Sequence, residues 1–124
     1  MASLPAAGSA SPSLAGLGER LAQEELRSSA RVLIVLALGV NRRLTFSDLL
    51  ELTHVAKGSL SYHLRQLESA GLVRSATLFT IRGQRMVVTI TEAGGELYRR
   101  LVEELRALPL DPRAEPRPSV PGVR

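Results

Sequence analysis

The side chains of clearest chemical use in this sequence are cations gathered between residues 57 and 85. The segment holds one lysine and four arginines against a single acidic residue, Glu68. Its net charge, five cations less one carboxylate, equals the formal net charge of +4 of the whole 124-residue chain. Because clustered cations gain affinity for nucleic acid by releasing its condensed counterions, this segment is typical of a surface that binds a polyanion.

Part of the cationic segment has the periodicity of a helix that could read DNA. Leu60, Leu64 and Leu67 recur at four and three residues, which predicts a helix over about 57–70 that stops at Gly71. Arginine on the opposite face can bond guanine O6 and N7 in bidentate fashion, tyrosine can contact a base edge or a phosphate, and serine and lysine can hold phosphates. The side chains predicted to contact DNA from this face are Lys57, Ser59, Ser61, Tyr62 and Arg65.

A second part of the segment has the pattern of a β-hairpin. Two stretches rich in Val, Ile, Thr and Phe, Leu72–Ile81 and Met86–Ile90, flank the residues Arg82-Gly83-Gln84-Arg85. We therefore predict two strands joined by a basic tip at about 82–85. Arg82, Gln84 and Arg85 are predicted to contact the DNA backbone or the minor groove.

Hydrophobic periodicity predicts the elements that position these side chains. The patterns indicate further helices at about 14–27, at 32–38, at 46–53 and from Thr91 onward. The last helix carries an apolar stripe of Leu97, Leu101, Leu105 and Leu108. Thr45-x-x-Asp48 resembles a capping box for the helix at 46–53, and Asn41-Arg42-Arg43 is predicted to be a polar turn.

The order of these elements is that of a winged helix-turn-helix, in which two helices joined by a short turn are followed by a hairpin, the wing. We therefore predict a mainly α fold with a small β wing and with extra N- and C-terminal helices for dimerisation. The helix at 57–70 would lie in the major groove and the wing on the backbone or in the minor groove. The predicted function is a sequence-specific regulator of transcription that binds double-stranded DNA.

A motif in residues 58–73 resembles two families of winged-helix regulators. It reads L-S-x-H-L-x-x-L-E-x-A-G-L-V from Leu60 and is similar to the MarR-like and ArsR-like groups. Gly83-Gln84-Arg85 and Val88–Gly94 resemble their wing and the start of their closing helix, so the likeness covers about 28–107. The resemblance implies a homodimeric repressor on a pseudo-palindromic operator, with dimerisation through the terminal helices. It also matches Ser59, Ser61, Tyr62 and Arg65 to the recognition helix, and Arg82 and Arg85 to the wing.

The domain organisation follows from composition and from the amount of apolar surface. Residues 1–13 are rich in Ala, Ser, Gly and Pro, and 109–124 contain five prolines, so we expect a flexible arm and a flexible tail around one domain at 14–108. The stretch at 32–38 is apolar on every face, which exceeds what so small a core can cover. This excess independently predicts a homodimer.

Several classes of protein are excluded or disfavoured. The chain has no cysteine, and His54 and His63 lack the spacing of paired ligands, so we expect no thiol redox switch, no metal site and no cofactor. No catalytic residues are assigned, because no phosphate loop or paired nucleophile and base is present. The longest apolar run, Val32–Val40, is too short to span a membrane, and no secretory signal precedes it, which favours a cytoplasmic protein. No residue pattern identifies a small-molecule effector.

Two alternatives to a DNA-binding regulator remain open at the level of sequence. A winged helix can instead serve as a protein-interaction module of a transcription or other assembly, although such modules need not concentrate charge on one helix and the wing. A single-strand RNA reader would normally offer stacking aromatic side chains, and only Tyr62 is well placed for that role.

Overall fold

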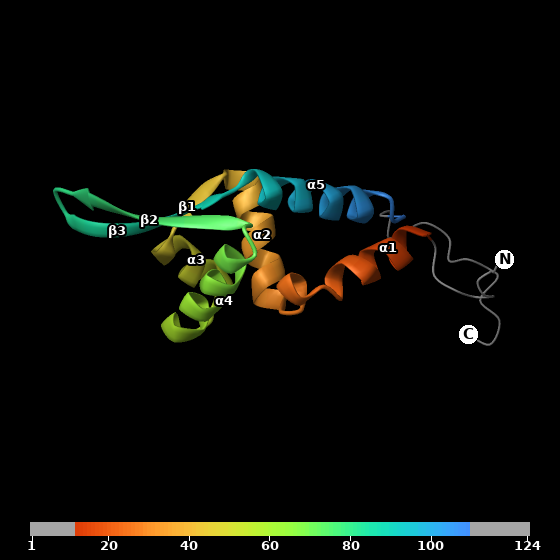
Figure 1. Ribbon diagram of the computed structural model, residues 1–124, viewed down its shortest axis with the longest axis horizontal. Helices are drawn as coiled ribbons and strands as arrows, with labels where there is room; N and C mark the ends of the chain where they lie inside the picture. Colours follow the sequence, from red (N-terminus) through yellow and green to blue (C-terminus); the bar gives the residue numbers. More distant parts are fainter. Residues whose placement is uncertain (1–11, 110–124) are drawn as a thin grey trace.

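The computed structural model describes residues 12–109 and confirms a winged-helix fold (Figure 1). The predicted arm up to residue 11 and the predicted tail from residue 110 lie outside the described residues. Six helical segments and three strands follow one another: α1 Pro12–Leu21, the 3-10 turn η1 Glu24–Leu26, α2 Ser29–Asn41, β1 Arg43–Thr45, α3 Phe46–Thr53, α4 Lys57–Ser69, β2 Val73–Thr80, β3 Gly83–Ile90 and α5 Glu92–Arg106. No helix among the described residues is long and apolar enough to cross a membrane.

The molecule is elongated, with different elements at its two ends. Figure 1 shows the β2–β3 hairpin projecting to one side beyond α3 and α4, while α1 and most of α5 extend to the other. Helix α2 lies between these two parts. The DNA-reading elements predicted from the sequence are thus separated from the terminal helices.

An aliphatic core holds α2, α3, α4 and the sheet together. The residues that are buried most fully are Leu26, Ile34, Val35, Leu38, Leu49, Leu60, Leu67, Val88 and Leu101. The near absence of aromatic residues in the sequence is matched by a core built from Leu, Ile and Val. Burial of branched aliphatic side chains is therefore the main force that fixes how α4 and the wing are placed.

Local capping signals in the sequence are confirmed by hydrogen bonds. Thr45 and Asp48 form a reciprocal capping box at the start of α3, with N–H to oxygen distances of 3.0 and 3.1 Å. Thr91 accepts from the Gly94 N–H at the start of α5. Helix α4 ends at Ser69, directly before the predicted stop, and the Leu72 N–H returns to the Leu67 carbonyl.

The single helix predicted at 14–27 is wrong, because the chain forms α1 and then the separate turn η1. Gln23 has extended backbone angles, with φ −66° and ψ 148°, which ends the run of helical residues. The break turns Leu26 into the core, where it packs with residues of α2. Periodicity alone did not indicate this change of direction.

The prediction that Asn41-Arg42-Arg43 forms only a polar turn is also wrong. Arg42, with φ 72°, reverses the chain, and Arg43 begins the short strand β1. This strand pairs antiparallel with β3, so that Leu44 lies opposite Val88, and the sheet order is β1-β3-β2. A strand of three residues is too short to show the alternation by which strands are recognised.

The hairpin tip is shorter than predicted. Strand β3 begins at Gly83, so Gln84 and Arg85 belong to the strand and only Ile81 and Arg82 form the turn. Gly83 has φ 118°, a conformation that side chains with a Cβ rarely adopt. It allows a tight turn to join two strands that pair in register along their whole length.

The start of α5 packs closely against Leu72, in the connection between α4 and β2. A Cβ at Gly94 would lie 2.1 Å from the carbonyl oxygen of Leu72, whereas a Cβ at the next residue, Gly95, would meet nothing within 4 Å. The stripe predicted on α5 is divided, because Leu101 is buried inside the chain while Leu105 remains exposed.

We expect Gly94→Ala to lower the free energy of unfolding by about 1–3 kcal/mol, because the added methyl group must push α5 away from Leu72. The matched control Gly95→Ala should raise it by about 0.5–1 kcal/mol, because alanine favours a helix and meets no neighbour there. Urea unfolding of both variants checks this. Equal effects at the two positions would contradict the close packing of α5.

Candidate nucleic-acid interface

Helix α4 separates a buried leucine face from an exposed polar face. Leu60, Leu64 and Leu67 are all buried. The residues predicted on the opposite side lie there: Lys57, Ser59, Tyr62 and Arg65 are exposed, and Ser61 is half-buried. The helix therefore presents a row of donors and cations to solvent while its other side is fixed in the core.

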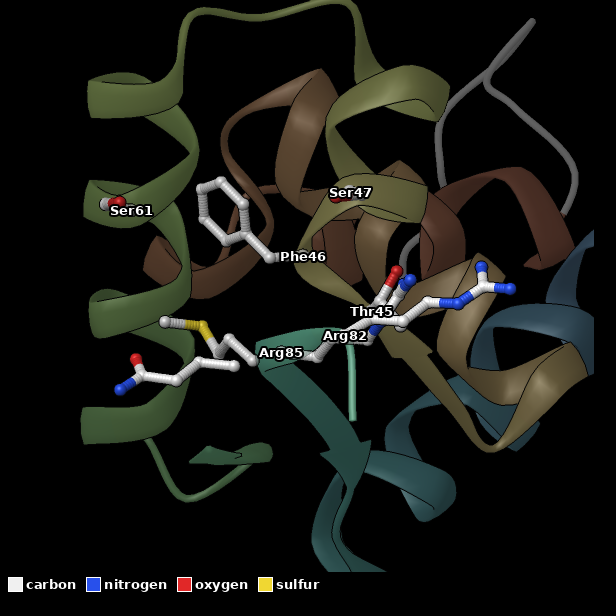
Figure 2. Close-up of a pocket in the computed structure, with 8 residues that line it drawn as sticks. Thr45, Phe46, Ser47, Ser61, Arg82 and Arg85 are labelled. Carbon is white, nitrogen blue, oxygen red and sulfur yellow. The ribbon is translucent and has the colours of Figure 1, made fainter. Parts of the chain in front are cut away.

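A groove lies between α4, the start of α3 and the wing. It has a volume of about 460 Å³ and is lined by Thr45, Phe46, Ser47, Ser61, Arg82, Gln84, Arg85 and Met86 (Figure 2). The structure thus brings together four of the predicted site residues, Ser61, Arg82, Gln84 and Arg85. The other four, Lys57, Ser59, Tyr62 and Arg65, lie on α4 outside this groove.

Half of the groove lining was missed from the sequence. Thr45 and Ser47 bring hydroxyl groups from the start of α3, and Figure 2 shows Phe46 reaching from there toward α4 and Ser61. The capping box marked this position as a helix start but gave no sign that the wing lies next to it. Met86, predicted only as a strand residue, completes the lining from β3.

The cations of α4 and the wing are not neutralised by carboxylates. In the part of the chain that the structure describes, the ion pairs join Arg20 to Glu104, Arg27 to Glu24, Arg99 to Glu96 and Glu103, and Arg100 to Glu96. None involves Lys57, Arg65, Arg82 or Arg85. Glu68, the one acidic residue of the cationic segment, instead accepts a hydrogen bond from the Ser75 N–H at the base of the wing. The positive potential of this face is therefore available to a polyanion.

A buried arginine of α2 contacts two side chains of α4. Arg31 of α2 is 7% exposed, and its Nε donates to His63 Nδ1 at 3.0 Å. Its NH1 group donates to the backbone oxygen of Glu24 at 3.1 Å, and its guanidinium carbon lies 5.5 Å from the centre of the Tyr62 ring. This cation–π contact and hydrogen bond orient two neighbouring side chains of α4. The sequence did not indicate the role of Arg31.

Both histidines have structural roles. His63 is half-buried and hydrogen-bonded, and His54 ends α3 in a left-handed conformation with φ 59°. Burial, and then the nearby charge of Arg31, lower the pKa of His63 below its ordinary value of 6.5. Because Nδ1 accepts from Arg31, the hydrogen bond requires this nitrogen to be unprotonated.

We expect the protein without DNA to lose stability as the pH falls below about 6.5. The folded pKa of His63 is lower than the unfolded one, so in this range the unfolded chain binds a proton that the folded chain does not. Protonation would also place a second cation beside Arg31. Thermal unfolding between pH 8 and pH 5 measures the effect. His63→Gln, which can still accept from Arg31, should flatten the profile, and an unchanged slope in this variant would remove His63 as its cause.

Comparison with known proteins agrees with this geometry. Residues 30–108 match the family described as winged helix DNA-binding domain. A transcriptional regulator homologue from Pyrococcus horikoshii OT3 is 31% identical, with a TM-score of 0.65 over 75% of this chain and 92% of that one. A MarR-family transcriptional regulator from Silicibacter pomeroyi is 28% identical, with a TM-score of 0.58 over 77% of this chain and 62% of that one.

This chain spans less than two thirds of the Silicibacter pomeroyi regulator, and no curated protein matches it in sequence. The family and the fold are those of transcription regulators rather than of enzymes. The chain belongs to the winged helix DNA-binding domain family, and its fold is that of the transcription regulators to which it is similar.

Proposed function

We propose that this protein is a sequence-specific repressor whose helix α4 enters the major groove of duplex DNA while its wing follows the backbone into the minor groove. The observation that carries the proposal is the groove of about 460 Å³ between α4 and the wing, which is bordered by arginines that have no ion-pair partner within residues 12–109. A sugar–phosphate strand is the polyanion that fits such a groove between two DNA-reading elements.

The residues of the interface divide into two roles. Arg65 and Tyr62, on the exposed face of α4, are proposed to read base edges, and Lys57, Ser59 and Ser61 to hold phosphates. Arg82, Gln84 and Arg85 are proposed to contact phosphates or the minor groove from the wing. Thr45 and Ser47 line the same groove, so we add their hydroxyl groups as proposed phosphate contacts.

The two roles make different predictions for binding. Arg65→Ala should cost about 1–3 kcal/mol on the preferred duplex and relax selectivity at one base pair. Arg82→Ala should instead weaken binding to all sequences alike and reduce the salt dependence by about one phosphate contact. Fluorescence anisotropy with a duplex selected from a random library, beside a random duplex, measures both effects.

The same titration tests the function itself. Micromolar binding of random duplex that falls steeply with salt, and less steeply in an Arg82→Ala/Arg85→Ala double variant, supports a wing on phosphates. Absence of binding even at low salt would favour the alternative, a winged helix that docks on another protein. Losses of equal size on every sequence for Arg65→Ala and Arg82→Ala would contradict the division of roles.

We further propose that 14–108 form one domain that acts in the cytoplasm as a homodimer through its terminal helices. The Arg20–Glu104 ion pair, 2.9 Å between NH2 and Oε2, fixes α1 against α5 as a single unit. Leu105, beside this pair, is 36% exposed. An isologous two-fold contact between such units would cover it and would set the spacing of two α4 helices on a pseudo-palindrome.

We expect sedimentation at micromolar concentration to give twice the chain mass of 13.4 kDa. Leu105→Glu should shift the protein toward a monomer, because it places a charge in the proposed interface. Leu52→Glu is the control, because Leu52 is 39% exposed and belongs to α3 rather than to the terminal helices. A monomeric wild-type mass would refute the dimer.

A further inference from the structure

The outer half of the wing exposes large apolar side chains that none of the described helices or strands covers. Among the described residues, Leu78, Phe79, Ile81 and Met86 account for four of the nine exposed large hydrophobic residues, although the wing is a small part of the structure. Phe79 is 76% exposed and Ile81 is fully exposed. Exposed apolar side chains gathered in this way mark a contact surface rather than ordinary scatter.

The strand register places these side chains on particular faces of the wing. Phe79 lies opposite Gln84, and Thr77 lies opposite Met86. Because side chains alternate along a strand, Phe79 and Met86 share the face of Val88, which is fully buried nearer the core. Met86 also lines the groove beside α4. We name Phe79, Met86 and the turn residue Ile81 the apolar wing edge.

The turn holds Ile81 outward in a fixed conformation. The Thr80 hydroxyl donates to the Gly83 carbonyl at 2.9 Å and accepts from the Arg82 N–H at 3.2 Å. Both bonds are made by the Thr80 side chain and close the turn, and Gly83 supplies the positive φ that the turn needs. A turn organised before binding loses little conformational entropy when it meets a partner.

The charge of the wing indicates the partner. No acidic residue occurs between Glu68 and Glu92, while Arg74, Arg82 and Arg85 lie within this stretch. A wing-to-wing contact between two copies would bring these arginines together without a compensating charge, which disfavours a second copy as the occupant. A cationic tip that also carries Phe, Ile and Met has the composition of proteins that insert apolar side chains into the minor groove.

We propose that the apolar wing edge contacts the minor groove next to the major groove occupied by α4, packing against deoxyribose rings and base-pair edges. This inference rests on the proposed DNA-binding function and adds to it an apolar contribution to affinity. Because this contribution releases no counterions, it does not depend on salt, unlike that of Arg82 and Arg85. The contact should favour A·T pairs beneath the tip, because guanine places an amino group on the floor of the minor groove.

The test compares Phe79→Thr/Ile81→Thr with Arg82→Ala/Arg85→Ala, using anisotropy on the selected duplex at several salt concentrations. Threonine suits the strand at position 79 and retains the β-branch of Ile81 in the turn, and both replaced side chains are exposed, so the variant should fold. We expect roughly tenfold weaker binding with an unchanged salt slope for the apolar variant. The arginine variant should show a shallower slope. Val40→Ser is the matched control, since Val40 is an exposed apolar residue on α2.

A second arm varies the DNA beneath the tip. Replacing A·T pairs there by G·C should weaken the wild-type protein but not the apolar variant, and inosine·C pairs, which lack the amino group, should restore wild-type binding. Unchanged affinity in the apolar variant, or the same response to G·C in both proteins, would overturn the proposal. So would a lower sedimentation mass of the apolar variant, which would assign the edge to a protein contact. Failure of the wild-type protein to bind any duplex would refute the proposed function instead.

Discussion

The burial of Leu60, Leu64 and Leu67 along one side of α4 is the constraint on which the rest of the structure depends. Each fully buried leucine contributes about 1.5–3 kcal/mol to the free energy of unfolding, and rotating the helix about its axis would lose this contribution for every leucine that became exposed. With the leucine face fixed against α2, α3 and the sheet, the donors of the opposite face have only one direction in which to point. A hydrophobic contact thus determines which side chains can reach DNA.

Arg31 adds polar contacts to the apolar packing of α4. A buried guanidinium without a carboxylate partner is costly, and here it is offset by a neutral histidine, a backbone carbonyl and an aromatic ring. Each of these partners belongs to α4 or to η1, so Arg31 joins the recognition helix to the segment that leads into α1. The orientation of Tyr62 therefore depends on a residue that lies 31 positions earlier and has no contact with the groove.

Most of the fold could be predicted from sequence, because its signals are local: leucine spacing in α4, the Thr45 and Asp48 capping box, and the glycine after α4. The features that were missed depend on contacts between distant residues. Strand β1 forms because β3 provides its pairing partner, and the chain turns at η1 because Leu26 packs into the core. The same distinction applies to the site. Periodicity predicted which side chains of α4 are exposed, but it did not predict that Ser47 and the wing line the same groove.

Charge is arranged differently at the two ends of the chain, and this arrangement matters for function. Around α1 and α5, Arg20, Arg99 and Arg100 form ion pairs with glutamates one helical turn away or across the helix pair. The electrostatic potential of that end is therefore small. The cations of α4 and the wing lack such partners among the described residues. A duplex is therefore attracted mainly to the end that carries α4 and the wing, and salt screens this attraction. In the proposed dimer, binding two half-sites together requires the terminal helices to stay associated at the salt concentrations at which α4 and the wing bind DNA.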